Sequence, residues 1–277
     1  MSIFLLAIDI DGTLLGSRGQ LLPENRVAVH DALKAGIEVV LVTGRCYHHA
    51  KPVAAVLSKT LVIIANNGAL VKTVDGRTLE KVLLNRKLAR EIILSTRQIK
   101  RGAALIFDRV QPSQYLFENV DWNHPNRKRY YDRNRRYMEE ASPLEDALIE
   151  DPLQLAFSGT LSEMRRLAEF LSGLELSEQI SITRTEYDYR NFSLLDITAC
   201  DCSKGSTLEA WATARGFDRE QVMAVGDNLN DREMLEFAGW PVVMGNAVPV
   251  LKTLGWRITG NHDEGGLAEA IRSIALI

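Results

Sequence analysis

The sequence has few cysteines and no long apolar segment. Its three cysteines, Cys46, Cys200 and Cys202, are too few for a disulfide framework and are typical of a reducing cytoplasm, where we expect the protein to reside. Cys200 and Cys202 are too close for the usual paired zinc spacing, so we expect no metal role for the cysteines. No apolar run approaches the roughly 20 residues needed to cross a bilayer, so no membrane partner is expected. Residues 3–8 lack a preceding basic region and end at Asp9, which is not typical of a signal peptide.

Positive charge is also not in excess, because the net charge is -3. A general basic field for nucleic acid or a membrane surface is therefore absent. The 277 residues, 46% hydrophobic and 25% charged, indicate one large or two moderate globular domains with a substantial core. The sequence contains no internal repeat or low-complexity segment, and it does not predict an oligomeric state.

One local exception to this charge balance is the stretch of residues 121–137, where basic and aromatic residues alternate. Three interpretations stay open. The segment can be a solvated loop and helix face with arginine stems packed on tyrosines, a substrate-phosphate contact, or a nucleic-acid contact. The first is favoured, so no nucleic-acid partner is expected. A steep salt dependence of oligonucleotide binding would indicate the third.

Short apolar runs alternate with helical patterns at both ends of the chain. This alternation predicts an α/β fold with a Rossmann-like parallel sheet and right-handed crossovers. Near the N-terminus we expect strands at 3–8, 37–42 and 61–65, a helix at 23–35 and a helical segment after Gly44. Near the C-terminus we expect strands at 221–225 and 241–244 and helices at 204–215, 231–238 and 267–274.

The middle of the chain has a different pattern. Helices are expected at 84–100 and 161–174, and separate strands at 105–107, 115–120, 153–158 and 180–185. This pattern predicts an α+β cap domain at 82–189, inserted into a core formed by 1–81 and 190–277. The edges carry an error of several residues.

Polar residues follow the predicted strands or open the helices beside them. Ligands of open parallel sheets bind beyond the carboxyl ends of the strands. Four such segments are present. Their acids and an asparagine are oxygen ligands that suit a hard cation such as Mg²⁺, while a lysine and a Thr-Gly turn among them can donate to a phosphate. The set therefore predicts a phosphoryl group bridged to a metal. The segments are Asp9-Ile10-Asp11-Gly12-Thr13, Thr43-Gly44-Arg45, Lys204-Gly205 and Gly226-Asp227-Asn228-Leu229-Asn230-Asp231.

In this order, the four segments resemble the motifs of the haloacid dehalogenase (HAD) superfamily of phosphotransferases. The Asn66-Asn67-Gly68-Ala69 turn, the large insert and the segment Asp263-Glu264-Gly265-Gly266 resemble its Cof-type branch (subclass IIB). Each motif alone is weak, but the ordered set is specific, and the resemblance covers nearly the whole chain.

The resemblance implies a role for each matching residue. Asp9 is expected to be the nucleophile that forms an aspartyl-phosphate, and Asp11 the general acid and base. Lys204 balances charge, and Thr43 binds the transferring phosphoryl group. Phosphate or substrate contacts are also expected for Gly12, Gly44, Arg45, Asn67 and Asn230. The expected cofactor is Mg²⁺, held by Asp9, Asp11 through its backbone carbonyl, Asp227 and, directly or as an anchor, Asp231.

Structural alternatives exist for most of these residues. Asp9 or Asp11 alone can be a turn residue or helix cap, and Thr43 and Asp231 can cap the helices that follow them. Lys204 can be a surface lysine, Arg45 can form a structural ion pair, and Asn67 can merely shape its turn. His48 and His49 are expected at solvated helix positions.

The predicted activity is that of a Mg²⁺-dependent phosphomonoester hydrolase acting on a small-molecule phosphomonoester. Relatives of this branch act on sugar phosphates or on phosphorylated cofactors such as pyridoxal phosphate and flavin mononucleotide. The inserted cap is expected to close over the site and choose the substrate, which the sequence does not identify. A phosphomutase of the same fold and a non-catalytic phospholigand-binding regulator are the alternatives.

Overall fold

The computed structural model describes residues 2–109 and 113–276 and divides the chain into two compact units. The core unit contains residues 1–81 and 202–277, and the insert contains residues 82–201. Within the described ranges, no helix has both the length and the apolar character needed to span a membrane.

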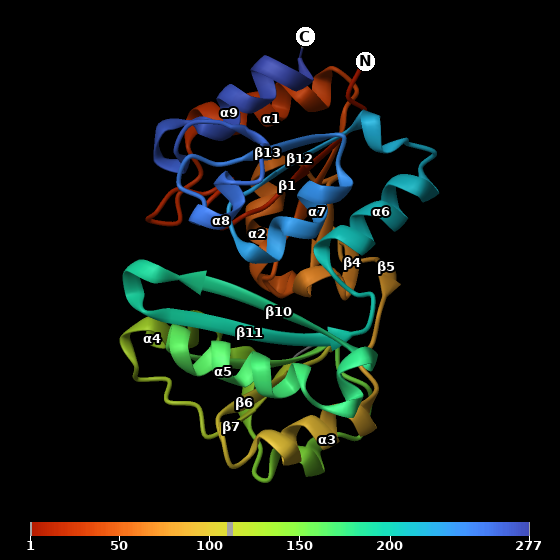
Figure 1. The fold of residues 1–277 in the computed structure, drawn as a ribbon. Coiled ribbons are helices and arrows are strands. Elements are labelled where there is room, and N and C mark those ends of the chain that lie inside the picture. Colours follow the sequence, from red (N-terminus) through yellow and green to blue (C-terminus); the bar gives the residue numbers. More distant parts are fainter. Residues whose placement is uncertain (1, 110–112, 277) are drawn as a thin grey trace. The chain divides into compact units, whose positions relative to one another are not determined.

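The core unit is built on an eight-stranded sheet with β1 near its centre (Figure 1). The strands from β14 to β3 in the sheet order are parallel, whereas β4 and β5 extend the edge beside β3 as antiparallel strands. All four residues of β1 are buried, as predicted for a strand covered on both faces. The sheet order is β14 (Arg257–Ile258), β13 (Trp240–Val243), β12 (Val222–Gly226), β1 (Leu5–Ile8), β2 (Glu38–Val42), β3 (Val62–Ala65), β4 (Leu70–Thr73) and β5 (Thr78–Lys81).

Helices cover this sheet because alternate residues of the buried strands point to opposite faces. Leu5 and Ala7 of β1 belong to the same apolar cluster as Leu208 of α6 and Met234 of α7. Helices α1 and α9 pack against each other (Figure 1). The helices of the core are α1 (Pro23–Lys34), α2 (Tyr47–Leu57), α6 (Lys204–Ala214), α7 (Arg232–Phe237), α8 (Pro249–Lys252) and α9 (Gly266–Ala270), which continues as a π-helical turn over Ile271–Ala275.

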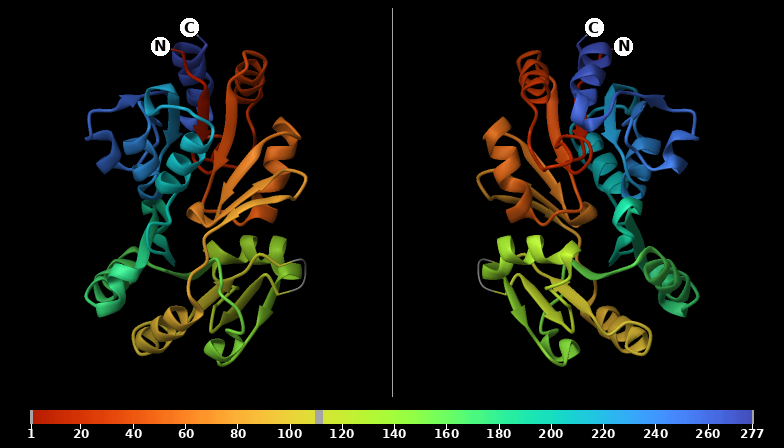
Figure 2. Two further views of the ribbon diagram at one scale, coloured as in Figure 1. Left: turned by 90° about the vertical axis from the view of Figure 1, so that its right-hand side faces the viewer. Right: turned by 90° about the vertical axis from the view of Figure 1, so that its left-hand side faces the viewer.

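The insert is a six-stranded, mainly antiparallel sheet with its own apolar core (Figure 2). Helices α3 (Arg86–Thr96) and α5 (Leu161–Ser172) pack their apolar stripes on the sheet through Ile92 and Leu167, among others. The sheet order is β10 (Ile180–Tyr187), β11 (Phe192–Ala199), β9 (Gln154–Gly159), β6 (Ala103–Ile106), β7 (Tyr115–Glu118) and β8 (Met138–Glu140).

The basic and aromatic stretch of residues 121–137 contains α4 (Pro125–Asn134) and a 3-10 turn over Arg135–Tyr137. Trp122 stacks on Tyr131 with 5.3 Å between ring centroids. Arg127 donates from Nε to Ser158 Oγ at 2.8 Å, and burial lowers the pKa of Arg127. Packing within the insert thus accounts for Trp122, Tyr131 and Arg127. The guanidinium of Arg136 lies 4.7 Å from the ring centroid of Tyr137, an arginine-on-tyrosine contact of the kind that the favoured interpretation expects.

The second predicted boundary of the insert is too early by about a dozen residues. The insert extends to residue 201 rather than 189, because the unpredicted strand β11 pairs with both β9 and β10. Since β11 lies between two partners of the insert's sheet, it cannot belong to the core. Its run Phe192-Ser193-Leu194-Leu195 directly follows the turn at Asn191 and has a strand signal of its own, although its pairing partners cannot be read from that run.

Candidate active site

The carboxyl ends of β1 and β12 bring two acids from distant parts of the sequence to one edge of the core sheet. β1 pairs in parallel with β12, with Ile8 opposite Val225. Asp9 follows the first strand and donates its backbone N–H to the Val225 carbonyl at 3.1 Å, while Asp227 follows the second. Both acids are buried. The pairing of the strands therefore confirms that these two motifs meet.

The turn after Asp9 is shaped by a glycine. Gly12 has a φ of +82°, and a Cβ at this position would lie 2.3 Å from Oδ2 of Asp227. Any larger residue would therefore strain the backbone and collide with a carboxylate. The next residue, Thr13, is buried and donates from Oγ1 to Oδ1 of Asp227 at 3.3 Å.

Lys204 lies between two of the acids. Its Nζ contacts Oδ1 of Asp9 and Oδ1 of Asp231, each at 2.6 Å, and the residue is only 1% exposed. It is the first residue of α6, whose start is fixed by a capping box from Ser203 to Ser206. The alternative that Lys204 is a surface lysine is therefore wrong.

Asp231 holds both Lys204 and the loop that begins at Asp227. Its Oδ2 accepts the backbone N–H groups of Asp227 and Asn228 at 2.9 Å, while its Oδ1 accepts from Lys204. Asp231 precedes α7 but makes no side-chain cap to that helix, since its carboxylate is turned back toward the loop. Its position therefore fixes both the loop and the lysine.

The electrostatics of the cluster favour a bound cation. Burial raises the pKa of Asp9 to about 8, and Asp231 adds to the rise while Lys204 opposes it. Burial and then Asp9 raise the pKa of Asp227 well above its ordinary value. Burial alone would lower the pKa of Lys204, but Asp231 and Asp9 raise it above its usual range. One lysine thus faces more negative charge than it can balance.

The donor set of this cluster fits the predicted Mg²⁺. Asp9, Asp227 and Asp231 each offer a carboxylate oxygen, and these oxygens lie within 4.8 Å of one another. Carboxylate oxygens are the ligands that a hard divalent cation prefers. Asp231 accepts three hydrogen bonds of 2.6, 2.9 and 2.9 Å, whereas the donors to Asp227 are more distant, at 3.3 Å for Thr13 and 3.5 Å for Asn246. Asp9 and Asp227 are therefore the better direct ligands, and Asp231 is the better anchor.

Asp11 is separate from this buried cluster. Its side chain is 46% exposed and forms a bidentate ion pair with Arg45, whose Nε and Nη2 lie 2.7 and 2.5 Å from the Asp11 carboxylate oxygens. The ion-pair interpretation of Arg45 is therefore correct for this structure. Because Asp11 is exposed, its carboxylate can reach a bound substrate without disturbing the buried acids.

The Thr43 and Asn67 turns lie side by side. Thr43 is buried, and its Oγ1 accepts from the backbone N–H of Arg45 at 3.1 Å. It does not cap α2, because the N-cap of that helix is Cys46. Asn67 Oδ1 accepts from Asn230 Nδ2 at 3.0 Å, and a Cβ on Gly44 would lie only 3.0 Å from that oxygen. The motifs of Thr43, Asn67 and Asn230 are thus brought together.

Asn67 also has the turn-forming role that the sequence left open. Its φ is 52°, in the left-handed region that asparagine tolerates better than most residues. The two interpretations of Asn67 are therefore compatible. The same side chain that belongs to a tight turn contacts Asn230.

Sequence reasoning missed Asn246. Its Nδ2 donates to the carbonyl of Gly12 at 2.8 Å and lies 3.5 Å from Oδ2 of Asp227, while its Oδ1 accepts from the backbone N–H of His262. Asn246 follows β13, so the rule that found Asp9 and Asp227 would have found it. Thr13, although part of a quoted motif, was also not proposed for the site.

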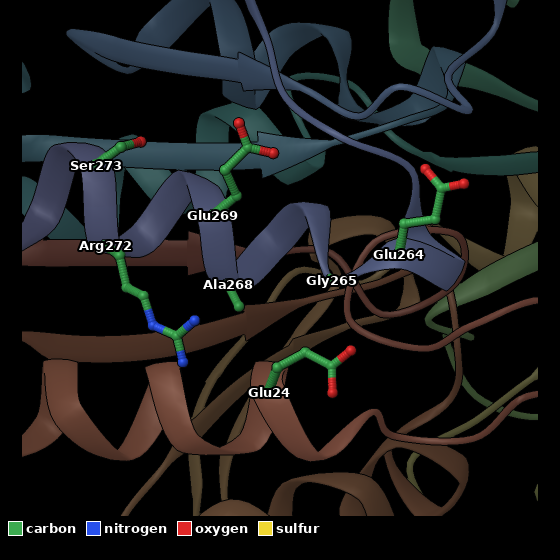
Figure 3. Close-up of a pocket in the computed structure, with 7 residues that line it drawn as sticks. All are labelled: Glu24, Glu264, Gly265, Ala268, Glu269, Arg272 and Ser273. Carbon is green, nitrogen blue, oxygen red and sulfur yellow. The ribbon is translucent and has the colours of Figure 1, made fainter.

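A pocket of about 540 Å³ lies elsewhere on the core unit, between α1 and α9 (Figure 3). Glu24 comes from α1, whereas Glu269 and Arg272 come from α9 and the turn that continues it. None of the predicted catalytic residues lines this pocket. The predicted catalytic residues therefore lie at the strand-end site and not in this pocket.

Comparison with known proteins identifies the family. The family described as haloacid dehalogenase-like hydrolase matches residues 6–271, and the chain belongs to it. Phosphatase YwpJ of Bacillus subtilis (strain 168) is 26% identical, over 98% of this chain and 99% of the relative. Pyridoxal phosphate phosphatase YbhA of Escherichia coli (strain K12) is 26% identical, over 99% of each chain. The structure of a haloacid dehalogenase-like hydrolase from B. subtilis has the same fold, with a TM-score of 0.82, 23% identity and coverage of 98% and 99%.

These findings confirm the resemblance drawn from the motifs. The chain is a phosphatase of the HAD family, and its core has the α/β fold with a parallel sheet that was predicted. The match spans both units, so the insert lies within the family's own architecture.

Proposed function

We propose that this protein hydrolyses small phosphomonoesters in a Mg²⁺-dependent reaction with Asp9 as the nucleophile. The observation that carries the proposal is the buried Asp9 carboxylate, held at 2.6 Å by Lys204 and facing Asp227. A carboxylate fixed in this way presents its second oxygen to an incoming phosphorus atom. Bound Mg²⁺ would neutralise negative charge on the acids and on the phosphoryl oxygens.

In the first step, an oxygen of Asp9 attacks phosphorus and the bond from phosphorus to the leaving oxygen breaks. Asp11 donates a proton to that oxygen, so the product leaves as an alcohol and Asp9 carries the phosphoryl group. In the second step, Asp11 takes a proton from water, the water oxygen bonds to phosphorus, and the bond from phosphorus to Asp9 breaks. The products are phosphate and the regenerated carboxylate.

The remaining side chains position the phosphoryl group and balance its charge. Lys204 neutralises charge on Asp9, and the Thr43 hydroxyl and the Asn230 amide are proposed to donate to phosphoryl oxygens. Arg45 holds Asp11 through two hydrogen bonds. That ion pair keeps the Asp11 carboxylate beside the turn, where the proton transfers take place.

The proposed substrate class is a small phosphorylated metabolite, such as a sugar phosphate or a phosphorylated cofactor. The relative YbhA is named for pyridoxal phosphate, which belongs to this class. The insert as the source of substrate choice stays a prediction. A panel of phosphometabolites assayed with Mg²⁺ would identify the preferred substrate.

The central test compares wild type with Asp9→Asn. We expect wild type to release phosphate steadily from p-nitrophenyl phosphate with Mg²⁺, and the variant to lose at least about a thousandfold in rate and to form no phosphoprotein. Asp11→Asn should slow turnover and leave Mg²⁺ binding largely intact, because its side chain lies outside the buried acids.

The same assays test the alternatives. Equal, low phosphate release by wild type and Asp9→Asn would indicate a phospholigand-binding regulator. Quantitative isomerisation of a hexose phosphate without phosphate release would indicate a phosphomutase. Substantial activity in Asp9→Asn would refute Asp9 as the nucleophile.

A further inference from the structure

A second group of potential metal ligands lies at the start of α2. The Sγ of Cys46 and one ring nitrogen from each of His48 and His49 all lie within 4.8 Å of one another. Cys46 is buried at the N-cap of α2, and the two histidines occupy the first turn of that helix. The histidine rings are 4.1 Å apart between centroids, at an angle of 68°.

The histidines differ from the sequence expectation. Solvated helix positions are expected for both, but both are half-buried and their Nε2 atoms are inaccessible to solvent. Cysteine spacing alone does not indicate this group, because the neighbours of Cys46 in it are histidines and not a second cysteine. The structure brings one thiol and two imidazoles together within four residues of chain.

We propose that Cys46, His48 and His49 form a binding site for a borderline-soft divalent ion of the Zn²⁺ type. Thiolate sulfur and imidazole nitrogen are the ligands that such ions prefer, whereas the cluster around Asp9 offers carboxylate oxygens. The two sites thus differ in chemical class. Three protein ligands would leave a fourth tetrahedral position for water or a small anion.

The geometry requires only a small closure of the side chains. Bonds of about 2.0–2.3 Å to one tetrahedral ion place ligand atoms roughly 3.5 Å apart. The ligand atoms now lie within 4.8 Å of one another, so rotation of the half-buried histidines has to bring them closer by at most about 1.3 Å. The backbone is already fixed, because the N–H groups of His49 and Ala50 donate to the Cys46 carbonyl at 3.0 and 3.2 Å. The N-terminus of α2 also favours the negative charge of a thiolate.

The site is adjacent in sequence to the Thr43-Gly44-Arg45 motif. The carbonyl of Arg45 accepts from the backbone N–H of Asn66 at 2.9 Å, and the Arg45 side chain holds Asp11. An ion bound to Cys46 would therefore restrain the backbone beside Arg45. Binding itself does not depend on the proposed phosphatase mechanism, so the two proposals can fail separately.

The test is metal binding to the full chain in excess Mg²⁺, which competes for the carboxylate cluster. We expect one equivalent of Zn²⁺ to bind in competition with a chromogenic chelator, and Co²⁺ to give a sulfur-to-cobalt charge-transfer band. Cys46→Ser should abolish the band and weaken Zn²⁺ binding at least tenfold. Cys200→Ser, which alters an exposed cysteine outside the cluster, should leave both readouts unchanged.

Two further variants make the result decisive. The double variant His48→Gln, His49→Gln should also lose at least tenfold in Zn²⁺ affinity, and it decides the test if the buried Cys46→Ser fails to fold. Asp227→Asn should keep the cobalt band, because that acid belongs to the other cluster. Wild type without a sulfur-to-cobalt band, or the double histidine variant binding Zn²⁺ as tightly as wild type, would overturn the proposal.

Discussion

Both units contain a network in which a basic side chain contacts two carboxylates, and the networks differ in burial. In the core, Lys204 contacts Asp9 and Asp231, and its side chain is 1% exposed. In the insert, Arg97 contacts Glu118 and Glu145, and its side chain is 37% exposed. Water can therefore screen the arginine but not the lysine.

The networks also differ in how their acids are satisfied. Glu118 accepts from Ser142 Oγ at 2.8 Å and from the backbone N–H of Leu144 at 3.2 Å, besides Arg97. In the core, Asp9 and Asp227 keep strongly raised pKa values. Buried charge in excess of its partners is unfavourable for folding alone and is typical of a site prepared for a cation and a phosphate. We therefore propose that the insert network stabilises its fold, whereas the core network serves the proposed phosphatase reaction.

The largest contrast is expected from removing the basic residue of each network. Lys204→Met should lower the rate of phosphate release at least about a hundredfold, because a charge partner of the nucleophile is lost. Arg97→Met should leave that rate within about twofold and lower the free energy of unfolding by about 1–3 kcal/mol. Phosphate release and thermal unfolding of both variants provide the measurement.

Circular dichroism controls for misfolding of Lys204→Met, whose substitution leaves Asp9 and Asp231 without their shared partner. Equal loss of activity in both variants would remove the distinction between the networks.

A smaller effect is expected from the ionisation of Asp9 in the core network, which should make the free energy of unfolding depend on pH when divalent ions are absent. The pKa of Asp9 is about 8 in the folded chain and ordinarily 3.8, so between these values the folded state holds a proton that the unfolded chain has released. The stability that this group contributes is therefore present below pH 4 and lost as pH rises toward 8, at up to about 1.4 kcal/mol per pH unit.

Thermal unfolding in EDTA across this range measures the slope. Asp9→Asn should flatten it, and Mg²⁺ should stabilise wild type more as pH rises. Parallel slopes for wild type and Asp9→Asn would show that Asp9 ionises normally.

The smallest effect is expected at Asn246, which contacts Gly12 and Asp227 without belonging to the charged network. Asn246→Ala should raise the Mg²⁺ concentration for half-maximal activity about tenfold and change the saturated rate less. A Mg²⁺ titration of phosphate release tests this expectation. A lower saturated rate with unchanged Mg²⁺ dependence would assign Asn246 a different role.

The sequence predicted the features that depend on local pattern. The buried strand before Asp9 and the strand before Asp227 are where their apolar runs place them. That Asp9 and Asp227 lie close together followed from the rule that the carboxyl ends of parallel strands lie at the same edge of a sheet. Local pattern could not show that both carboxylate oxygens of Asp231 accept hydrogen bonds. It also could not show that the Asp11 carboxylate pairs with Arg45 and stays outside the buried cluster of Asp9, Asp227 and Asp231.

Two of the missed features depend on partners that are distant in the sequence, and the third is a local cluster. The strand β11 belongs to the insert because of its pairing with β9 and β10, which no local signal reveals. Asn246 reaches Gly12 across 234 positions of sequence. Cys46 and the histidines became a candidate site only when helix α2 placed their side chains together.

The central place of β1 also has a consequence for the order of folding during synthesis. β1 pairs with β2, but its other neighbour, β12, begins only at Val222. The contiguous insert of residues 82–201 has left the ribosome's active centre before that strand is made. Because domains tend to fold as units as they emerge, the insert can complete its sheet while the N-terminal strands still have an open edge. The two acids, Asp9 and Asp227, therefore come together only after the whole insert has been synthesised.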